Sequence, residues 1–290
     1  MMRSFLFVPG DSPRKFAKAM GGEADALILD LEDSVAATAK ATARACVIDM
    51  LQAERGGKAL FVRVNALDTG LTLADLAAVM PFAPDGIVLP KCEGPNDLRT
   101  CAHYLAAFEA AHDLQQTNIL AITTETAASL FSLGQYRDVD PRLWGLMWGA
   151  EDLAASLGAR QNTNEGTYTE PFRLARNLCL AGAASADVVA VDTICANLKD
   201  LQAVEAEANG ARRDGFGAKA VIHPDHVAPV NRAFQPTPEE LDWARKVIDA
   251  FAINPEAGVV NIDDQMIDRP HYRAAERILA ASQHQNGRKI

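Results

Sequence analysis

The chain lacks several features that mark whole classes of protein. Its five cysteines are scattered, odd in number and without C-x-x-C spacing, which argues against a disulfide framework or a zinc site and for free thiols in a reducing cytosol. Apolar residues nowhere continue for the roughly 18 positions of a membrane-spanning helix. The apolar run at Phe5 is too short for a signal peptide. We therefore expect a cytoplasmic protein with no membrane partner.

Positive charge is also scarce. Lys and Arg number 28 against 38 Asp and Glu, which gives a formal net charge of -10 and a sequence pI near 5.1. Such a field repels phosphate backbones, so we expect no nucleic-acid partner. An anionic small-molecule substrate would have to be held by a local cation. The remaining composition, 49% hydrophobic and 23% charged, is that of an ordinary globular protein.

A glycine-rich G-x-G-x-x-G is missing after the first apolar run, which argues against an open dinucleotide-binding sheet. Short apolar runs do recur, and a stretch of helical periodicity follows each one. The runs do not alternate with polar residues, so they indicate strands covered on both faces, as in parallel sheets. We expect these strands at residues 5–9, 26–31, 59–64, 86–91, 118–123, 143–148, 187–192 and 218–223.

Eight strands alternating with helices predict an α/β fold, a closed (β/α)8 TIM barrel over residues 1–235. Its first helix is expected to begin with Ser12 as N-cap and Pro13 in the first turn, and to end at Gly21. Residues 236–290 are expected to form a C-terminal helical lid extension. There Thr237 and Glu240 form a capping box before one helix, and the stretch GVVNIDDQMID is interpreted as a polar-flanked loop before a last helix.

Charged or polar residues follow nearly every apolar run, which is where TIM barrels place their chemistry. A random collection of solvated loops would not need such a residue at nearly every strand. We therefore predict that the carboxylates line a shared mouth. The set comprises Asp30, Glu32, Asp33, Arg63, Asn65, Lys91, Glu125, Glu151, Asp152, Asp192 and His223.

Within this set Glu125 and Asp152 follow neighbouring strands, so their side chains should lie side by side. Facing carboxylates repel each other and need a cation, and oxygen ligands without a nearby His or Cys suit Mg²⁺, or Mn²⁺, better than zinc. The backbone amides of Ala150, Glu151 and Asp152 open a helix and would favour a substrate carboxylate. Arg63 adds a two-donor anion clamp that a lysine does not reproduce.

Together the motifs resemble those of one family. Eight motifs follow one another along the chain, namely RSFLFVPG, ALILDLEDSV, FVRVN, GIVLPK, the Glu125-Thr126 pair, GAEDLAASLG, GFGAKAVIHP and QMIDRP. Their order is the one found in the citrate lyase beta-subunit-like family. This family belongs to the HpcH/HpaI aldolase group, which includes malyl-CoA and citramalyl-CoA lyases. The similarity runs from Arg3 to about Ile278, which is nearly the whole chain.

The resemblance implies a barrel that assembles as a trimer or hexamer, with Mg²⁺ on Glu125 and Asp152 and a CoA thioester as substrate. It also implies that Arg63 acts on the substrate keto or hydroxyl oxygen, and that Asp268 is brought by the lid over a neighbouring subunit's site. The implied reaction cleaves a 3-hydroxy-3-carboxyacyl-CoA of the malyl, citramalyl or citryl type to an α-keto acid and acetyl-CoA. Asp268 would protonate the acetyl-thioester enolate.

The chain departs from the family pattern at two places. This chain has DDQMID where the family usually has DGKMID, and Ser129 where the family usually has a glycine after the glutamate motif. These changes leave the implied metal site intact, and they affect the lid contacts and the preference for an acyl carrier.

Other interpretations of the predicted site are open. Glu125 and Asp152 are also compatible with ordinary capping acids. Arg63 is also compatible with a salt bridge to Glu32 at the barrel mouth. Glu32 and Lys91 are expected to orient the metal ligands rather than to react, since such sites need groups that position the ligands.

Residues at the edge of the predicted site also allow more than one interpretation. Arg14 and Lys15, in the first turn after the first strand, would bind a phosphate of CoA or simply begin a solvated helix. His223 would form a wall of the ligand pocket or shape its loop. Asp30 and Asp33 are equally compatible with site and structural roles. Two other functions are open, a hydroxyacyl-CoA thioesterase on the same site and a non-catalytic acyl-CoA-binding subunit of a larger lyase complex.

Overall fold

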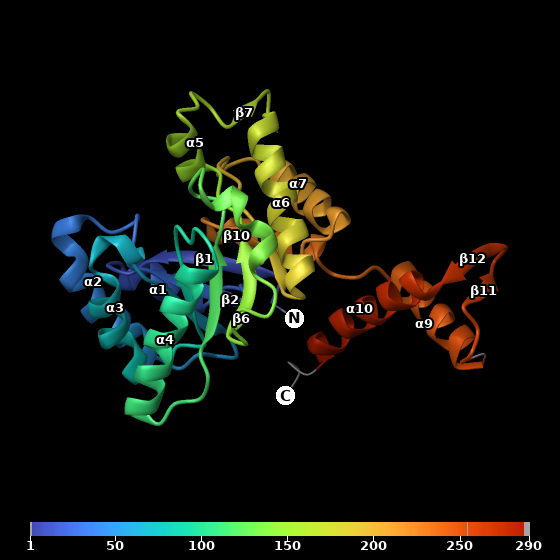
Figure 1. Ribbon diagram of the computed structural model, residues 1–290, viewed down its shortest axis with the longest axis horizontal. Coiled ribbons are helices and arrows are strands. Elements are labelled where there is room, and N and C mark those ends of the chain that lie inside the picture. The colour runs from blue at the N-terminus through green and yellow to red at the C-terminus, as the bar shows by residue number, and fades with distance from the viewer. Residues whose placement is uncertain (1, 254, 287–290) are drawn as a thin grey trace. The chain divides into compact units, whose positions relative to one another are not determined.

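The computed structural model describes the backbone of residues 2–253 and 255–286 (Figure 1). The chain divides into two compact units, a barrel unit of residues 2–233 and a C-terminal unit that begins at Phe234. Within the described residues, no helix is both long and apolar enough to cross a lipid bilayer.

The barrel unit is a closed barrel of eight parallel strands in the order β1-β10-β9-β6-β5-β4-β3-β2. The predicted TIM barrel is therefore confirmed, and every strand lies within the range expected from an apolar run or extends it by one residue. The strands are β1 (Ser4–Pro9), β2 (Ala26–Asp30), β3 (Ala59–Arg63), β4 (Gly86–Leu89), β5 (Asn118–Ile122), β6 (Leu143–Met147), β9 (Val189–Asp192) and β10 (Ala218–Val221).

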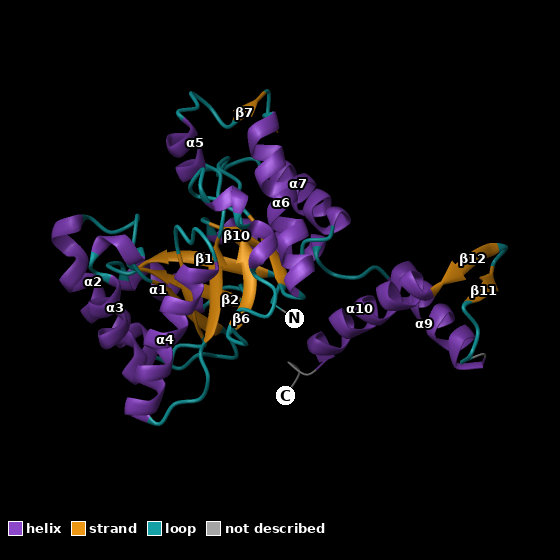
Figure 2. Ribbon diagram, viewed as in Figure 1, coloured by secondary structure: helices purple, strands orange, loops and turns teal. Residues whose placement is uncertain are grey.

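Helices surround these strands, as Figure 2 shows. Ser12 lies at the N-cap of the first helix, although its side chain makes no capping hydrogen bond. A short antiparallel pair, β7 (Thr163–Asn164) and β8 (Thr167–Tyr168), is inserted after α5. The helices are α1 (Pro13–Met20), α2 (Lys40–Gln52), α3 (Thr72–Val79), α4 (Pro95–His112), α5 (Glu151–Leu157), α6 (Glu170–Ala186), α7 (Leu201–Asp214) and α8 (Val227–Ala233).

Side chains fill the inside of the barrel, because alternate residues of each strand point inward. Phe61 and Val88 are fully buried there, and the rings of Phe5 and Phe61 meet edge to face with centroids 5.4 Å apart. Gly86 is required beside them, since a Cβ at this position would come within 2.2 Å of the Phe61 ring. The interior is therefore packed, and the chemistry of such a barrel is expected at the carboxyl ends of the strands.

The C-terminal unit consists of α9 (Pro238–Ile253), an antiparallel hairpin and α10 (Arg269–Asn286). The predicted capping box is present, because Thr237 N–H donates to Glu240 Oε2 at 2.7 Å and Glu240 N–H donates to Thr237 Oγ1 at 3.2 Å. The prediction of a loop between α9 and α10 is wrong. Residues 259–268 form strands β11 (Val259–Ile262) and β12 (Gln265–Asp268) instead.

The physical reason is the turn between these strands. Asp263 and Asp264 both have positive φ, 52° and 63°, which is the conformation of a two-residue hairpin turn and one that Asp tolerates. Ile267 is then buried against α9 beside Phe251. The β-branched residues Val259, Val260 and Ile262, followed by a two-residue Asp-Asp turn, were the signal for a hairpin.

Candidate functional site

A cavity of about 900 Å³ opens at the carboxyl ends of the barrel strands, and its volume lies within the range of small-molecule sites. The residues that line it all belong to the barrel unit. Eight of the residues singled out from the sequence as ligands, clamps or pocket walls are brought together here. They are Arg14, Lys15, Arg63, Glu125, Ala150, Glu151, Asp152 and His223.

Arg63, at the end of β3, is held by a carboxylate at the end of the neighbouring strand. Its Nε and Nη2 donate to the two oxygens of Asp30, both at 2.7 Å, and Asp30 is its partner in the strand register. Nη1 lies 3.0 Å from Glu32 Oε2, and the guanidinium lies over the Phe7 ring at 4.9 Å. The predicted clamp is therefore fixed in orientation, and the alternative contact with Glu32 exists beside it.

Asp30 and Arg63 are both ionised. Burial opposes the charge of Asp30, but the hydrogen bonds and charge of Arg63 outweigh that effect and hold the Asp30 pKa below its usual range. Burial likewise opposes the charge of Arg63, and the contacts with Asp30 hold the Arg63 pKa above its usual value. Arg63 is thus a permanent cation, 9% exposed, that lines the cavity.

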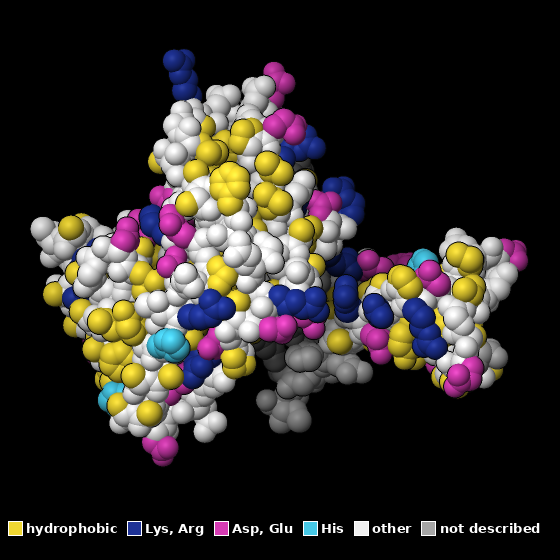
Figure 3. Space-filling model, viewed as in Figure 1, with side chains coloured by type: hydrophobic (Ala, Val, Ile, Leu, Met, Phe, Trp, Pro, Cys, Tyr) yellow, Lys and Arg dark blue, Asp and Glu magenta, His cyan; other side chains and the backbone are white. Residues whose placement is uncertain are grey.

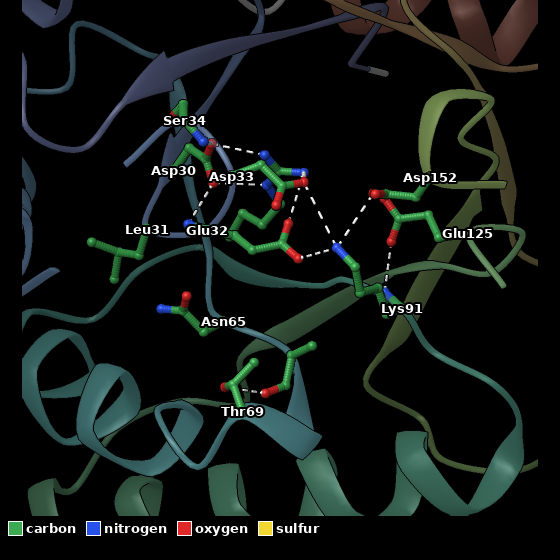
Figure 4. Close-up of polar contacts among 12 residues, drawn as sticks. Asp30, Leu31, Glu32, Asp33, Ser34, Asn65, Thr69, Lys91, Glu125 and Asp152 are labelled. Atoms are coloured by element: carbon green, nitrogen blue, oxygen red, sulfur yellow. Dashed lines mark hydrogen bonds and ion pairs between the residues drawn. The ribbon is translucent and has the colours of Figure 1, made fainter. Parts of the chain in front are cut away.

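Lys91 is the second cation and lies between several acids (Figure 4). Its Nζ is 2.6 Å from Glu32 Oε1, 3.3 Å from Asp152 Oδ2 and 3.7 Å from Asp33 Oδ2. Its backbone N–H donates to Glu125 Oε2 at 2.6 Å. The backbone is in the left-handed region, with φ of 49°, which is uncommon for lysine. One residue therefore contacts both predicted metal ligands, as expected of a positioning group.

Glu125 is 5% exposed, and burial and the nearby charge of Glu32 raise its pKa to about 8. Among the residues that the structure describes, neither Glu125 Oε1 nor Asp152 Oδ1 receives a hydrogen bond, and both residues line the cavity. In the same described residues no three His, Cys, Asp or Glu side chains form a complete metal cluster. Two carboxylates with free oxygens nevertheless fit Mg²⁺, which usually keeps water and substrate oxygens in its other positions.

Two members of the predicted mouth lie elsewhere. Asp192 accepts from Trp148 Nε1 at 2.6 Å and from Lys219 Nζ at 2.9 Å, and it is buried outside the barrel interior. Its neighbour Val191 points inward instead. Asn65 Nδ2 donates to Asp75. Both expectations were wrong, because a position at a strand end does not determine which face of the strand a side chain occupies.

The sequence also left some cavity residues unrecognised. Lys18 lines the cavity together with Arg14 and Lys15, and its spacing of three and four residues along α1 was the available signal. Ile194, Leu198 and Ile222 form an apolar part of the wall. Their apolar side chains carry no charge that would indicate a cavity, and Ile222 fell within an expected strand.

Asp268 ends β12 in the C-terminal unit. Its Oδ1 lies 2.5 Å from Nδ1 of His271, at the start of α10. His271 is thus the immediate partner of the predicted acid. The catalytic role of Asp268 stays a prediction.

Comparisons with known proteins give consistent results. The family model of the HpcH/HpaI aldolase/citrate lyase family matches residues 3–224. A citrate lyase subunit beta-like protein of Mycobacterium tuberculosis is 34% identical over 277 residues, 95% of this chain and 93% of that protein. A (3S)-malyl-CoA thioesterase of Cereibacter sphaeroides is 34% identical over 288 residues, 97% of this chain and 94% of that protein.

A solved structure is similar over nearly the same length. The crystal structure of the protein CitE from Mycobacterium tuberculosis in complex with magnesium, acetoacetate and coenzyme A has a TM-score of 0.78 and 31% sequence identity. The similarity covers 97% of this chain and 98% of that chain. It therefore spans the segments of both units.

Proposed function

The chain belongs to the HpcH/HpaI aldolase/citrate lyase family, and from that premise we propose that it is a Mg²⁺-dependent carbon–carbon lyase. The proposed substrate is a 3-hydroxy-3-carboxyacyl-CoA of the malyl, citramalyl or citryl type. The products are an α-keto acid and acetyl-CoA. The observation that carries the proposal is the pair Glu125 and Asp152, which line the same cavity as the fixed Arg63. Each has one carboxylate oxygen that accepts no hydrogen bond from the described part of the chain.

In this proposal Glu125 and Asp152 hold the metal. When bound, Mg²⁺ supplies a Lewis acid that stabilises negative charge on oxygen. Lys91 orients both ligands, through its backbone N–H to Glu125 and its ammonium group to Asp152. Glu32 in turn holds that ammonium group at 2.6 Å. The site is therefore arranged before substrate enters, which spares reorganisation during the reaction.

Arg63 would donate to the substrate hydroxyl oxygen, where negative charge develops as the carbon–carbon bond breaks. Asp30 keeps the guanidinium in one orientation through its two hydrogen bonds. Bond cleavage converts the hydroxyl to the keto group and leaves an acetyl-thioester enolate. Asp268 would take up the hydroxyl proton as a general base and then deliver it to the enolate carbon as a general acid.

The CoA portion of the substrate would lie along the rim of the cavity. Arg14, Lys15 and Lys18 are exposed cations on α1 that line it, and they would bind phosphate groups. The apolar wall with Leu198 and the side chain of His223 would face the uncharged arm of the thioester.

A product assay tests the proposal. Purified protein with Mg²⁺ is incubated with malyl-, citramalyl- and citryl-CoA, and the products are identified by mass spectrometry. We expect an α-keto acid and acetyl-CoA from at least one substrate, and loss of both with Glu125→Gln or Asp152→Asn. Mg²⁺-independent turnover, or full activity in both variants, would contradict the metal assignment.

A thioesterase on the same site is the second candidate, favoured by the Cereibacter sphaeroides relative. The same assay separates the two reactions, because hydrolysis gives the free hydroxy acid and CoA rather than a keto acid and acetyl-CoA. If neither product forms, a non-catalytic subunit that binds acyl-CoA for a larger lyase complex is the interpretation to pursue.

A homo-oligomer, trimeric or hexameric, forms part of the proposal. Figure 3 shows hydrophobic side chains on the surface of the barrel unit, and Phe131 and Leu174 are 87% and 56% exposed. Light scattering after size exclusion gives the assembly state. If Asp268 acts on a neighbouring subunit, mixing Asp268→Asn with Arg63→Ala protein under subunit exchange should restore part of the activity. No recovery despite exchange would contradict action between subunits.

A further inference from the structure

Thr124 connects the two loops that carry the proposed metal ligands. Its Oγ1 accepts a hydrogen bond from the Gly149 N–H at 2.9 Å and donates one to the Gly149 carbonyl oxygen at 3.2 Å. Thr124 is fully buried. A single hydroxyl therefore satisfies both backbone polar groups of one residue, across the gap between the loops that follow β5 and β6.

The position of this contact is what gives it importance. Thr124 directly precedes Glu125, and Gly149 lies three residues before Asp152. The two chains are so close here that a Cβ on Gly149 would lie 3.2 Å from Glu125 Cγ and 3.5 Å from Glu125 Oε1. A change in the Thr124 contact would therefore change the separation between the backbones that carry Glu125 and Asp152.

We propose that Thr124 is a positioning residue that sets the spacing of Glu125 and Asp152 for a divalent cation. The inference rests on the metal site of the proposed function. Thr124 itself supplies no ligand in this arrangement, since both bonds of its hydroxyl are made with the Gly149 backbone. Groups that orient metal ligands typically affect metal affinity by about 10- to 100-fold.

The neighbouring residue provides a matched control. Thr123 is also fully buried, and its hydroxyl faces the Cys179 sulfur at 3.8 Å instead of the loop after β6. Thr123→Val and Thr124→Val make the same change of a hydroxyl to a methyl group at adjacent positions. Thr124→Ser keeps the hydroxyl and removes only the methyl group.

The measurement is metal binding by substrate-free protein. Mg²⁺ affinity is determined by calorimetry, Mn²⁺ affinity by electron paramagnetic resonance, and folding by circular dichroism and thermal melting. We expect Thr124→Val to weaken both affinities about 10-fold or more, while Thr124→Ser and Thr123→Val stay within about threefold of the wild type.

Each outcome decides a different point. If wild-type protein binds neither cation, the metal site of the proposed function fails. If wild type binds and folded Thr124→Val binds equally well, the positioning role of Thr124 fails while the metal site stands. An equal loss in Thr123→Val and Thr124→Val also overturns the proposal, because the effect then comes from the buried segment in general. If Thr124→Val does not fold, the proposal is tested with Thr124→Ser and Thr123→Val alone. Both variants must then bind the cations with wild-type affinity, and a loss in either one contradicts the proposal.

Discussion

Two groups of charged residues in the barrel unit differ in charge balance. One group joins α6 and α7 to β9 and β10 and contains three acids and three cations in mutual contact, namely Asp192, Glu207, Asp214, Arg176, Arg213 and Lys219. The group at the cavity contains five acids and two cations, namely Asp30, Glu32, Asp33, Glu125, Asp152, Arg63 and Lys91.

This difference separates a structural cluster from a candidate active site. Asp192 is 3% exposed and satisfied by neighbours that also belong to the protein. At the cavity, acids outnumber cations, and Glu125 and Asp152 have oxygens without a donor among the described residues. A surplus of carboxyl groups over cations favours an external cation, which relieves their mutual repulsion. The balanced group has no such surplus.

The largest effect is expected from Asp192→Asn. The amide retains an acceptor for Trp148 but leaves Lys219, which is 1% exposed, without its buried counter-charge. Breaking a buried pair from one side typically costs about 3–5 kcal/mol. Urea unfolding at pH 7 with a chelator present measures the loss.

The contrasting variant is Glu125→Gln, which removes one of five crowded acids and should leave the metal-free free energy of unfolding within about 1 kcal/mol of the wild-type value. Equal losses in the two variants would remove the distinction between the clusters.

Arg63→Lys should show the opposite behaviour, with a large effect on activity and a smaller one on stability. A lysine keeps the charge but cannot donate to both oxygens of Asp30 while it faces the substrate. We expect kcat to fall about 100-fold, comparable to loss of an oxyanion donor. The control is Arg176→Lys in the balanced cluster, where Arg176 contacts Asp192 and stacks on Phe216. Near-wild-type kcat in Arg63→Lys would make Arg63 only a salt-bridge partner.

The pH dependence of stability should also distinguish the clusters. Burial opposes the charge of Asp192, but Lys219, Arg176 and the Trp148 hydrogen bond outweigh it and lower the Asp192 pKa. A lowered folded-state pKa contributes stability above the unfolded pKa of about 3.9, and this contribution is lost as the pH falls through the folded pKa. The difference in unfolding free energy between wild type and Asp192→Asn should therefore be constant from pH 7 to pH 5 and narrow below about pH 4. A difference that does not change with pH would mean that Asp192 is not ionised in the folded protein.

The same comparison explains what the sequence could and could not predict. Non-alternating apolar runs identified all eight barrel strands, since burial on both faces leaves a clear compositional pattern. Charge at strand ends indicated Glu125, Asp152 and Arg63, which do line the cavity, but it also included Asp192, which does not. The face on which a terminal residue points depends on register and twist, which a single sequence does not display. Thr124 went unrecognised because its role lies in two backbone hydrogen bonds.

The smallest effect is expected from Gly149→Ala, which tests how strongly Mg²⁺ affinity depends on the position of Glu125. Gly149 does not have a positive φ, so alanine fits its backbone, but the new methyl group would lie 3.2 Å from Glu125 Cγ. Glu125 would have to shift by a few tenths of an ångström, and we expect Mg²⁺ affinity to fall a few-fold, on the order of 1 kcal/mol. Gly134→Ala is the matched control, because a Cβ there meets nothing within 4 Å. Calorimetric titration of both variants measures the difference. If Gly149→Ala binds Mg²⁺ as tightly as Gly134→Ala, the position of Glu125 is not critical, and the spacing between the two loops carries less of the cation affinity than the charge surplus does.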